Sequence, residues 1–112
     1  MHQLHEMRTC IDACTQCAID CEACFSHDLE AGGMSNCARI NLDCAAACCE
    51  AASAMSRGST LVHQICGHCA AMCDACAEEC HKHVDEHCRV CEESCRRCAE
   101  ECRKMVHEAA HT

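Results

Sequence analysis

The chain has 112 residues, of which 19 are cysteine, one is aromatic and none is proline. This length suits one small hydrophobic core, so we expect a single domain over residues 1–112. The formal net charge of -9 argues against nucleic acid or an anionic membrane as the main partner, because both repel an acidic surface, and it favours cations.

The first ten residues, MHQLHEMRTC, lack a basic segment followed by an apolar one, so they do not predict a secretion signal. No apolar run in the sequence approaches the roughly 20 residues that cross a bilayer. We therefore expect a cytoplasmic protein, whose cysteines stay reduced.

The first periodic segment is CIDACTQCAIDCEAC, residues 10–24, in which the cysteines alternate at steps of four and three. This spacing places all of them on one face of an α-helix. The segment predicts a helix over residues 2–29, which ends before Gly32 and Gly33.

The second segment, NCARINLDCAAACCE at residues 36–50, has fewer cysteines on the same stripe. Asn41 stands at a stripe position, and we interpret it as a hydrogen-bonded core residue rather than a ligand. Cys49 leaves the stripe, because it lies about 100° around the helix from the preceding cysteine. We predict a helix over residues 35–56 with Ser35 as its N-cap.

The third and fourth segments, CGHCAAMCDACAEEC and CRVCEESCRRCAEEC, repeat the steps of three and four. They predict helices over residues 60–82 and 85–110, separated by a less distinct break than the earlier ones. The candidate N-cap residues are Ser59 or Thr60 for the third helix and Asp85 for the fourth.

Short connections make consecutive helices antiparallel neighbours, so we predict an all-α fold, an antiparallel up-down-up-down four-helix bundle with a cysteine-lined core. Eighteen of the 19 thiols then face one axis, and Cys49 is the exception. These inward cysteines are the candidate metal ligands: Cys10, Cys14, Cys17, Cys21, Cys24, Cys37, Cys44, Cys48, Cys66, Cys69, Cys73, Cys76, Cys80, Cys88, Cys91, Cys95, Cys98 and Cys102.

So many inward thiols indicate metal binding, because a core built only for packing would use leucine, isoleucine and valine. Disulfides between helix neighbours are not expected, since their Cβ atoms lie about 5–6 Å apart and a disulfide needs about 3.5–4.5 Å. Cu(I) accepts two or three soft thiolates, so pairs one turn apart, such as Cys17 with Cys21, predict multiple Cu(I) ions. A capacity of about one ion per inward cysteine exceeds what a single catalytic or transfer site needs, so it indicates storage. We expect no catalytic residue.

Methionines extend the cysteine stripes at one end of the predicted bundle. Met7, Met55 and Met105 meet there, with Val62 or His63 from the start of the third helix. Thioether and imidazole groups bind Cu(I) more loosely than thiolate does. We therefore take Met7, Met55, His63 and Met105 as candidate ligands where ions pass into the bundle, although methionine also commonly fills gaps in cores.

Other functions for a cysteine-rich chain remain open. A metallothionein-like zinc or cadmium buffer would use the same thiolates, but such proteins lack regular helices before they bind metal. A thiol redox protein would need one CxxC at a helix start in a βαβ context. Structural zinc and iron–sulfur sites usually take their ligands from loops, and a metallochaperone needs only one exposed pair of thiols.

The serial CxxxC and CxxC ladders CIDACTQCAIDCEAC, CGHCAAMCDACAEEC and CRVCEESCRRCAEEC resemble those of the bacterial copper storage proteins. The resemblance covers nearly the whole chain. Because the sequence shows no recognisable signal peptide, it resembles the cytosolic branch of that family in particular. It implies a homotetramer of four-helix bundles, each of which binds many Cu(I) ions and stores or detoxifies copper. The matching ligands are the inward cysteines, whereas Asn41 and Ala51 depart from the stripe of the second helix.

Overall fold

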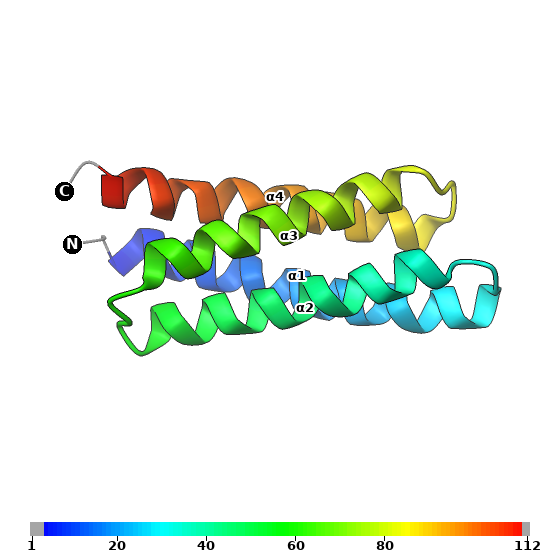
Figure 1. Ribbon diagram of the computed structural model, residues 1–112, viewed down its shortest axis with the longest axis horizontal. Coiled ribbons are helices and arrows are strands. Elements are labelled where there is room, and N and C mark those ends of the chain that lie inside the picture. The colour runs from blue at the N-terminus through cyan, green and yellow to red at the C-terminus, as the bar shows by residue number, and fades with distance from the viewer. Residues whose placement is uncertain (1–3, 111–112) are drawn as a thin grey trace.

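Four α-helices of 20 to 28 residues, which run side by side along the long axis of the molecule, make up the described part of the chain (Figure 1). The structure, a computed structural model, describes the backbone of residues 4–110 and the side chains of residues 7–107. The helices are α1 (Leu4–Ala31), α2 (Ser35–Ser56), α3 (Val62–His81) and α4 (Glu86–Ala110). Consecutive helices are antiparallel, so the predicted up-down-up-down four-helix bundle is confirmed.

Where the structure describes them, the helix ends agree with the predicted breaks to within two residues, and the N-caps differ more. Residues 2 and 3 of the first predicted helix lie outside the described residues. Met34, not Ser35, occupies the N-cap position of α2, and Leu61 occupies that of α3. The Ser59 hydroxyl still accepts a hydrogen bond at 3.1 Å, but from the backbone N–H of Leu61 outside the helix. Asp85 directly precedes α4, and its backbone carbonyl accepts from Arg89 as expected.

Gly58 lets the chain reverse after α2. Its φ of 66° lies in the left-handed region, which costs glycine little because it has no Cβ. The N–H of Gly58 donates to the carbonyl of Met55, and the N–H of Ser59 donates to that of Ala54. This pair of bonds is a Schellman motif, which satisfies carbonyls at the helix end and turns the chain towards α3.

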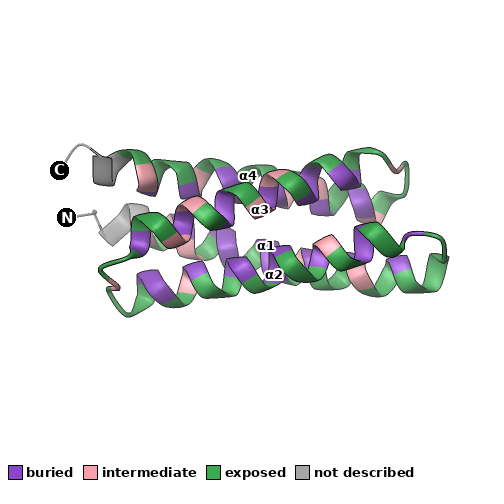
Figure 2. Ribbon diagram, in the orientation of Figure 1, coloured by how far each residue is buried: buried purple, intermediate pink, exposed green. Residues whose placement is uncertain are grey.

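Cysteine and alanine fill the interior, as the near absence of aromatic residues predicts. Figure 2 shows buried positions following one side of each helix, the side that faces the other three. The Cα atoms extend over 46 Å along the bundle and over 20 and 19 Å across it. The width corresponds to two helices side by side. The axis of the bundle is therefore a narrow column of sulfur atoms.

Two ends of this column differ in chemistry. At the end that holds the α2–α3 connection, Met55 and Met105 are buried and Met7 is partly buried. We call this the methionine end. At the opposite end, the buried carboxylate of Asp28 and the partly exposed ring of His87 lie beside the last thiols, and we call this the Asp28 end.

Within residues 4–110, every helix falls short of the combined length and apolarity that a membrane span requires.

The side chain of Glu79 links α3 to α2 and to the α3–α4 connection through hydrogen bonds. Its carboxylate accepts hydrogen bonds from Asn36 at 2.9 Å and Lys82 at 3.3 Å, and it pairs with the ring of His83 at 3.0 Å. Burial opposes ionisation, but the bonds from His83, Asn36 and Lys82 outweigh it and lower the pKa of Glu79 below its ordinary 4.5.

Because the pKa of Glu79 is lowered by folding, its stabilisation is complete above pH 4.5 and is lost as pH falls through the lower folded value. We expect Glu79→Gln to cost about 1 kcal/mol of unfolding free energy at neutral pH, and this cost to shrink below pH 4.5. Denaturant unfolding of the reduced, metal-free wild type and variant at several pH values measures this difference in unfolding free energy. The neighbouring exposed Glu78→Gln is the control, and equal costs for the two variants would contradict the assignment.

Candidate metal centre

All 18 predicted inward cysteines are buried, each at most 1% exposed, and Cys49 is exposed, as its position off the stripe of the second helix predicts. Each helix presents its thiols at steps of three and four residues, so successive sulfurs lie one above another on the same face. None of the described cysteines forms a disulfide.

Thirteen of the buried thiols form one continuous chain of sulfur–sulfur hydrogen bonds, with Sγ–Sγ distances of 3.6 to 4.0 Å. The chain passes between all four helices. We call it the long thiol network, and its members are Cys10, Cys14, Cys17, Cys21, Cys44, Cys48, Cys69, Cys73, Cys76, Cys91, Cys95, Cys98 and Cys102.

Most of these contacts join different helices. Three of the predicted pairs at i and i+4 are joined by hydrogen bonds with Sγ–Sγ distances of 3.9 to 4.0 Å: Cys17 with Cys21, Cys69 with Cys73, and Cys91 with Cys95. Shorter contacts run across the bundle, such as Cys44 to Cys73 at 3.6 Å. The sequence pattern predicts the ladders but not these crossings, because they depend on how each helix is rotated against its neighbours.

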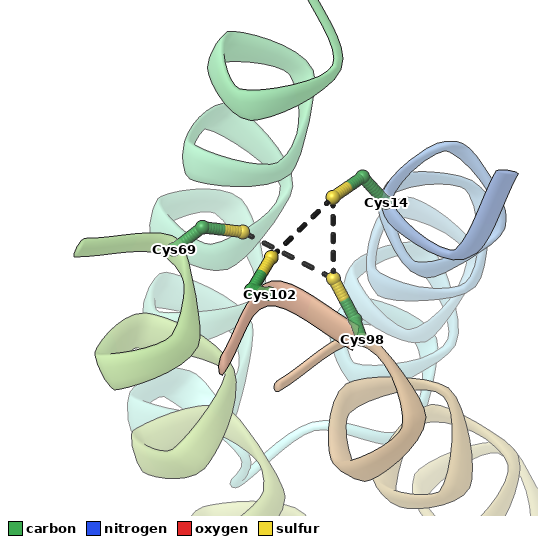
Figure 3. Close-up of side chains that lie close together, drawn as sticks. All are labelled: Cys14, Cys69, Cys98 and Cys102. Carbon is green, nitrogen blue, oxygen red and sulfur yellow. Dashed lines mark hydrogen bonds between the residues drawn. The ribbon is translucent and has the colours of Figure 1, made fainter. Parts of the chain in front are cut away.

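Groups of four thiols surround points on the axis. In Figure 3, Cys14 of α1, Cys69 of α3 and Cys98 and Cys102 of α4 point towards one another, and their sulfurs lie within 4.8 Å of one another. Cys98 donates to Cys14 at 3.6 Å, and Cys69 contacts Cys98 at 4.0 Å. Such a group offers one ion two, three or four sulfur ligands. Cys98 also belongs to the neighbouring group of Cys17, Cys48 and Cys73.

Four further thiols lie at the Asp28 end, and we call Cys24, Cys37, Cys80 and Cys88 the short thiol set. Cys37 and Cys80 contact each other at 3.9 Å. Cys24 and Cys88 instead face the carboxylate of Asp28, at 4.0 and 3.8 Å. Cys24, Asp28, Cys37 and Cys88 together make a group whose ligand atoms lie within 4.8 Å of one another.

Asp28 is a candidate ligand that the sequence analysis missed. The signal was present, since Asp28 follows Cys24 by four residues and so continues the stripe of α1. Its carboxylate is fully buried and pairs with Nε2 of His87 at 2.8 Å. A carboxylate is rarely buried unless it is paired with a cation or a metal ion. An aspartate in a sequence is therefore normally expected at the protein surface.

Asn41 is fully buried and hydrogen-bonded, as its sequence interpretation required. Its side-chain Nδ2 donates to Oδ2 of Asp28 at 3.0 Å. Its Oδ1 accepts from the thiols of Cys76 at 3.2 Å, Cys91 at 3.6 Å and Cys80 at 4.0 Å. The amide therefore satisfies a buried carboxylate on one side and buried thiols on the other.

The electrostatics of the core follow from burial and shared protons. Burial raises the pKa of the Cys88 thiol to about 12, and the charges of Cys24 and Asp28 act in the same direction. Within the long thiol network, the hydrogen bond that joins Cys10 and Cys102 lowers the pKa of Cys10 and raises the pKa of Cys102. The thiols therefore exchange protons as a coupled set, and a metal ion that binds them displaces protons.

At the methionine end, the structure separates the candidates that the sequence grouped together. Val62 is buried and completes the layer with Met55 and Met105, whereas the side chain of His63 is exposed and turns away from the core. His63 follows Val62 by one residue, so only one of them can face the axis, and the apolar residue does. Cys66 lies one turn further in, near Cys10.

These features define a four-helix bundle whose interior is an array of soft sulfur ligands. The sequence profile of the copper storage proteins matches residues 3–107, and the chain belongs to that family. It is a family of storage proteins rather than of enzymes.

Solved structures of high similarity carry the same fold. The Cu(I)-bound copper storage protein BsCsp3, of Bacillus subtilis, is 39% identical and superimposes with a TM-score of 0.87 over 90% of this chain and 98% of that one. A cytosolic copper storage protein from Streptomyces lividans, with five coppers, is 34% identical, with a TM-score of 0.87 over 92% of this chain and 93% of that one.

An uncharacterised cysteine-rich protein of Bacillus subtilis strain 168 is 41% identical over 64 residues. That match covers 54% of this chain and 59% of the other protein's length.

Proposed function

We propose that this chain stores Cu(I), binding many ions inside a bundle that is folded before metal arrives. The long thiol network is the observation that carries the proposal, because its sulfurs are already within bridging distance of one another across all four helices. One catalytic or transfer site would need only a few ligands. The Cu(I)-bound and copper-loaded relatives support the choice of ion.

The 18 inward cysteines are the proposed ligands, and their number sets the capacity at about one Cu(I) per inward thiol. Each thiolate can bridge two ions, so clusters grow along the axis from one group of four to the next. Each thiol loses its proton on binding, and the incoming positive charge replaces the charge of that proton. The core therefore stays close to neutral as it fills.

We further propose that the chain is one domain, that it works in the cytoplasm as a buffer or detoxifier of copper, and that it assembles as a homotetramer. The cytosolic relative from Streptomyces lividans supports the compartment. Met7, Met55 and Met105 remain proposed auxiliary ligands at the methionine end. His63, which faces solvent, would bind an ion only outside the core.

A zinc or cadmium buffer is the second candidate, and a specific observation favours it. Groups of four thiols within 4.8 Å can close around a tetrahedral ion such as Zn(II). Against it, neighbouring groups share thiols, because Cys17, Cys21, Cys95 and Cys98 each belong to two of them. Filling neighbouring groups is therefore easier for an ion that needs only two or three sulfur ligands, as Cu(I) does, than for one that needs four.

Anaerobic titration of the reduced apo protein with Cu(I), against a competing chromophoric chelator, tests the proposal. We expect tight uptake of about one ion per inward cysteine, with helical circular dichroism already present before metal is added. Cys49→Ala is the matched control, and it should bind as much copper as the wild type because its thiol is outside the core. Saturation at a few ions, or helicity that appears only with Zn(II), would contradict storage of Cu(I).

A further inference from the structure

The outer side of the α1–α2 pair carries an exposed apolar surface that the copper-binding core does not explain. Ile19 and Leu29 of α1 are 56% and 62% exposed, and Leu42 of α2 is 44% exposed. Among the described residues, these are three of the six large apolar side chains that are exposed. Grouped apolar side chains on a surface mark a place where another molecule binds.

Helical spacing places these side chains on one long face of the bundle. Asp20 of α1 contacts Ser94 of α4, and Asn36 of α2 contacts Glu79 of α3. The sides of α1 and α2 that are turned away from those contacts lie next to each other and point outwards. We call this surface the α1–α2 face, and its apolar members are Ile11, Ile19, Phe25, Leu29, Leu42 and Cys49.

The α1–α2 face carries no net formal charge, although the protein as a whole has a net charge of -9. On α2 its positions 35, 38, 42, 45, 46, 49, 53 and 56 hold only serine, alanine, leucine and cysteine. On α1 its positions 8, 11, 15, 19, 22, 26 and 29 include one arginine and one glutamate, whose charges cancel.

The opposite long face, formed by α3 and α4, is charged instead. There Asp74 pairs with Arg103, and Glu92 pairs with Arg96. Two copies of an acidic protein repel each other in most orientations, and they do so least where the local charge is zero. The α1–α2 face therefore fits a second copy of this chain better than it fits a basic partner, which the acidic surfaces would attract.

We propose that two copies of this chain associate through their α1–α2 faces, with Cys49 inside the interface. The proposal rests on the proposed homotetramer and is independent of copper storage. A two-fold axis sets the same patch of both copies against itself, and an apolar patch without net charge is compatible with that arrangement. A different contact between two such pairs completes the tetramer.

The size of the face is sufficient for a stable contact. The Cα atoms span 46 Å along the bundle and 20 Å across it, so one long face covers roughly 900 Å², close to the about 800 Å² that each partner buries in a stable interface. The small side chains of Ala46, Cys49 and Ser53 let a second helix approach α2 closely, with Leu42 and Ile19 filling the space beside it.

The oligomeric state of the double variant Ile19→Glu/Leu42→Glu tests the proposal. Both side chains are exposed in the single chain, so the variant should keep the helical circular dichroism of the wild type. Two carboxylates per copy would be buried without partners in the interface. We expect the mass measured by sedimentation to fall from that of four chains to that of two or one.

Val90→Glu is the matched control, because Val90 is 45% exposed and lies on α4, away from the α1–α2 face. It should keep the mass of the wild type. An unchanged mass in the double variant, or equal dissociation in the control, would overturn the proposal. A wild type with the mass of one chain would overturn the homotetramer as well. Failure of copper storage is seen separately, as a low Cu(I) stoichiometry.

Alkylation of Cys49 provides a second readout. In the Cu(I)-loaded protein the inward cysteines are metal ligands, so the thiol of Cys49 is the one left for a reagent such as iodoacetamide. We expect this thiol to react several-fold more slowly in the wild type than in Ile19→Glu/Leu42→Glu, because the interface covers it. Equal rates would place Cys49 outside the contact and contradict the proposal.

Discussion

Alanine in place of Cys17, Cys48, Cys73 and Cys98 is expected to lower the Cu(I) capacity by about four ions per chain. These thiols form one of the central groups of the axis, with sulfurs within 4.8 Å of one another. Their loss removes the ligands of the cluster and interrupts the long thiol network in its middle. Competitive titration, with the bound copper counted by native mass spectrometry, measures the capacity.

The same variant should remain helical, since each change removes one sulfur atom from a core that four helices surround. Each small cavity costs about 1 kcal/mol, so the metal-free protein will be less stable but folded under mild conditions. Replacing the group at the Asp28 end, Cys24, Asp28, Cys37 and Cys88, is the comparison, and it should remove about three ions. An unchanged capacity in the central variant would show that its thiols are packing residues only.

Asn41→Leu is expected to reduce the unfolding free energy of the reduced, metal-free protein by about 3 kcal/mol. Leucine has the same number and branching of side-chain heavy atoms as asparagine, with larger methyl groups in place of the amide, but it cannot donate to the carboxylate of Asp28 or accept from Cys76. The buried carboxylate then retains His87 as its partner but loses the amide donor at 3.0 Å. Denaturant unfolding followed by circular dichroism measures the change.

A double-mutant cycle separates this electrostatic cost from ordinary repacking. With Asp28→Asn as the background, no buried charge needs the Asn41 donor, so Asn41→Leu should cost clearly less than it does in the wild type. Equal costs in the two backgrounds would mean that the hydrogen bond between Asn41 and Asp28 contributes little, and that the loss arises from contacts with the thiols.

The pattern of cysteines at steps of three and four was sufficient to predict the helices, their order and their inward faces. Helical geometry is local, so residues separated by these steps share a face whatever surrounds them. For this reason all 18 inward cysteines were identified, and Cys49 was placed outside the core. The weaker predictions concerned helix starts, where Met34 and Leu61 took N-cap positions that residue preferences had assigned to serine or threonine.

The sequence by itself therefore determined the bundle and the set of thiols within it. Only the tertiary structure decided which thiols meet, that Asp28 joins them and that His63 does not. The reason is physical: a residue's neighbours across the core depend on the rotation and axial shift of each helix against the other three, which packing of the whole interior sets. Burial of Asp28 in particular depends on Asn41 and His87, which come from α2 and α4.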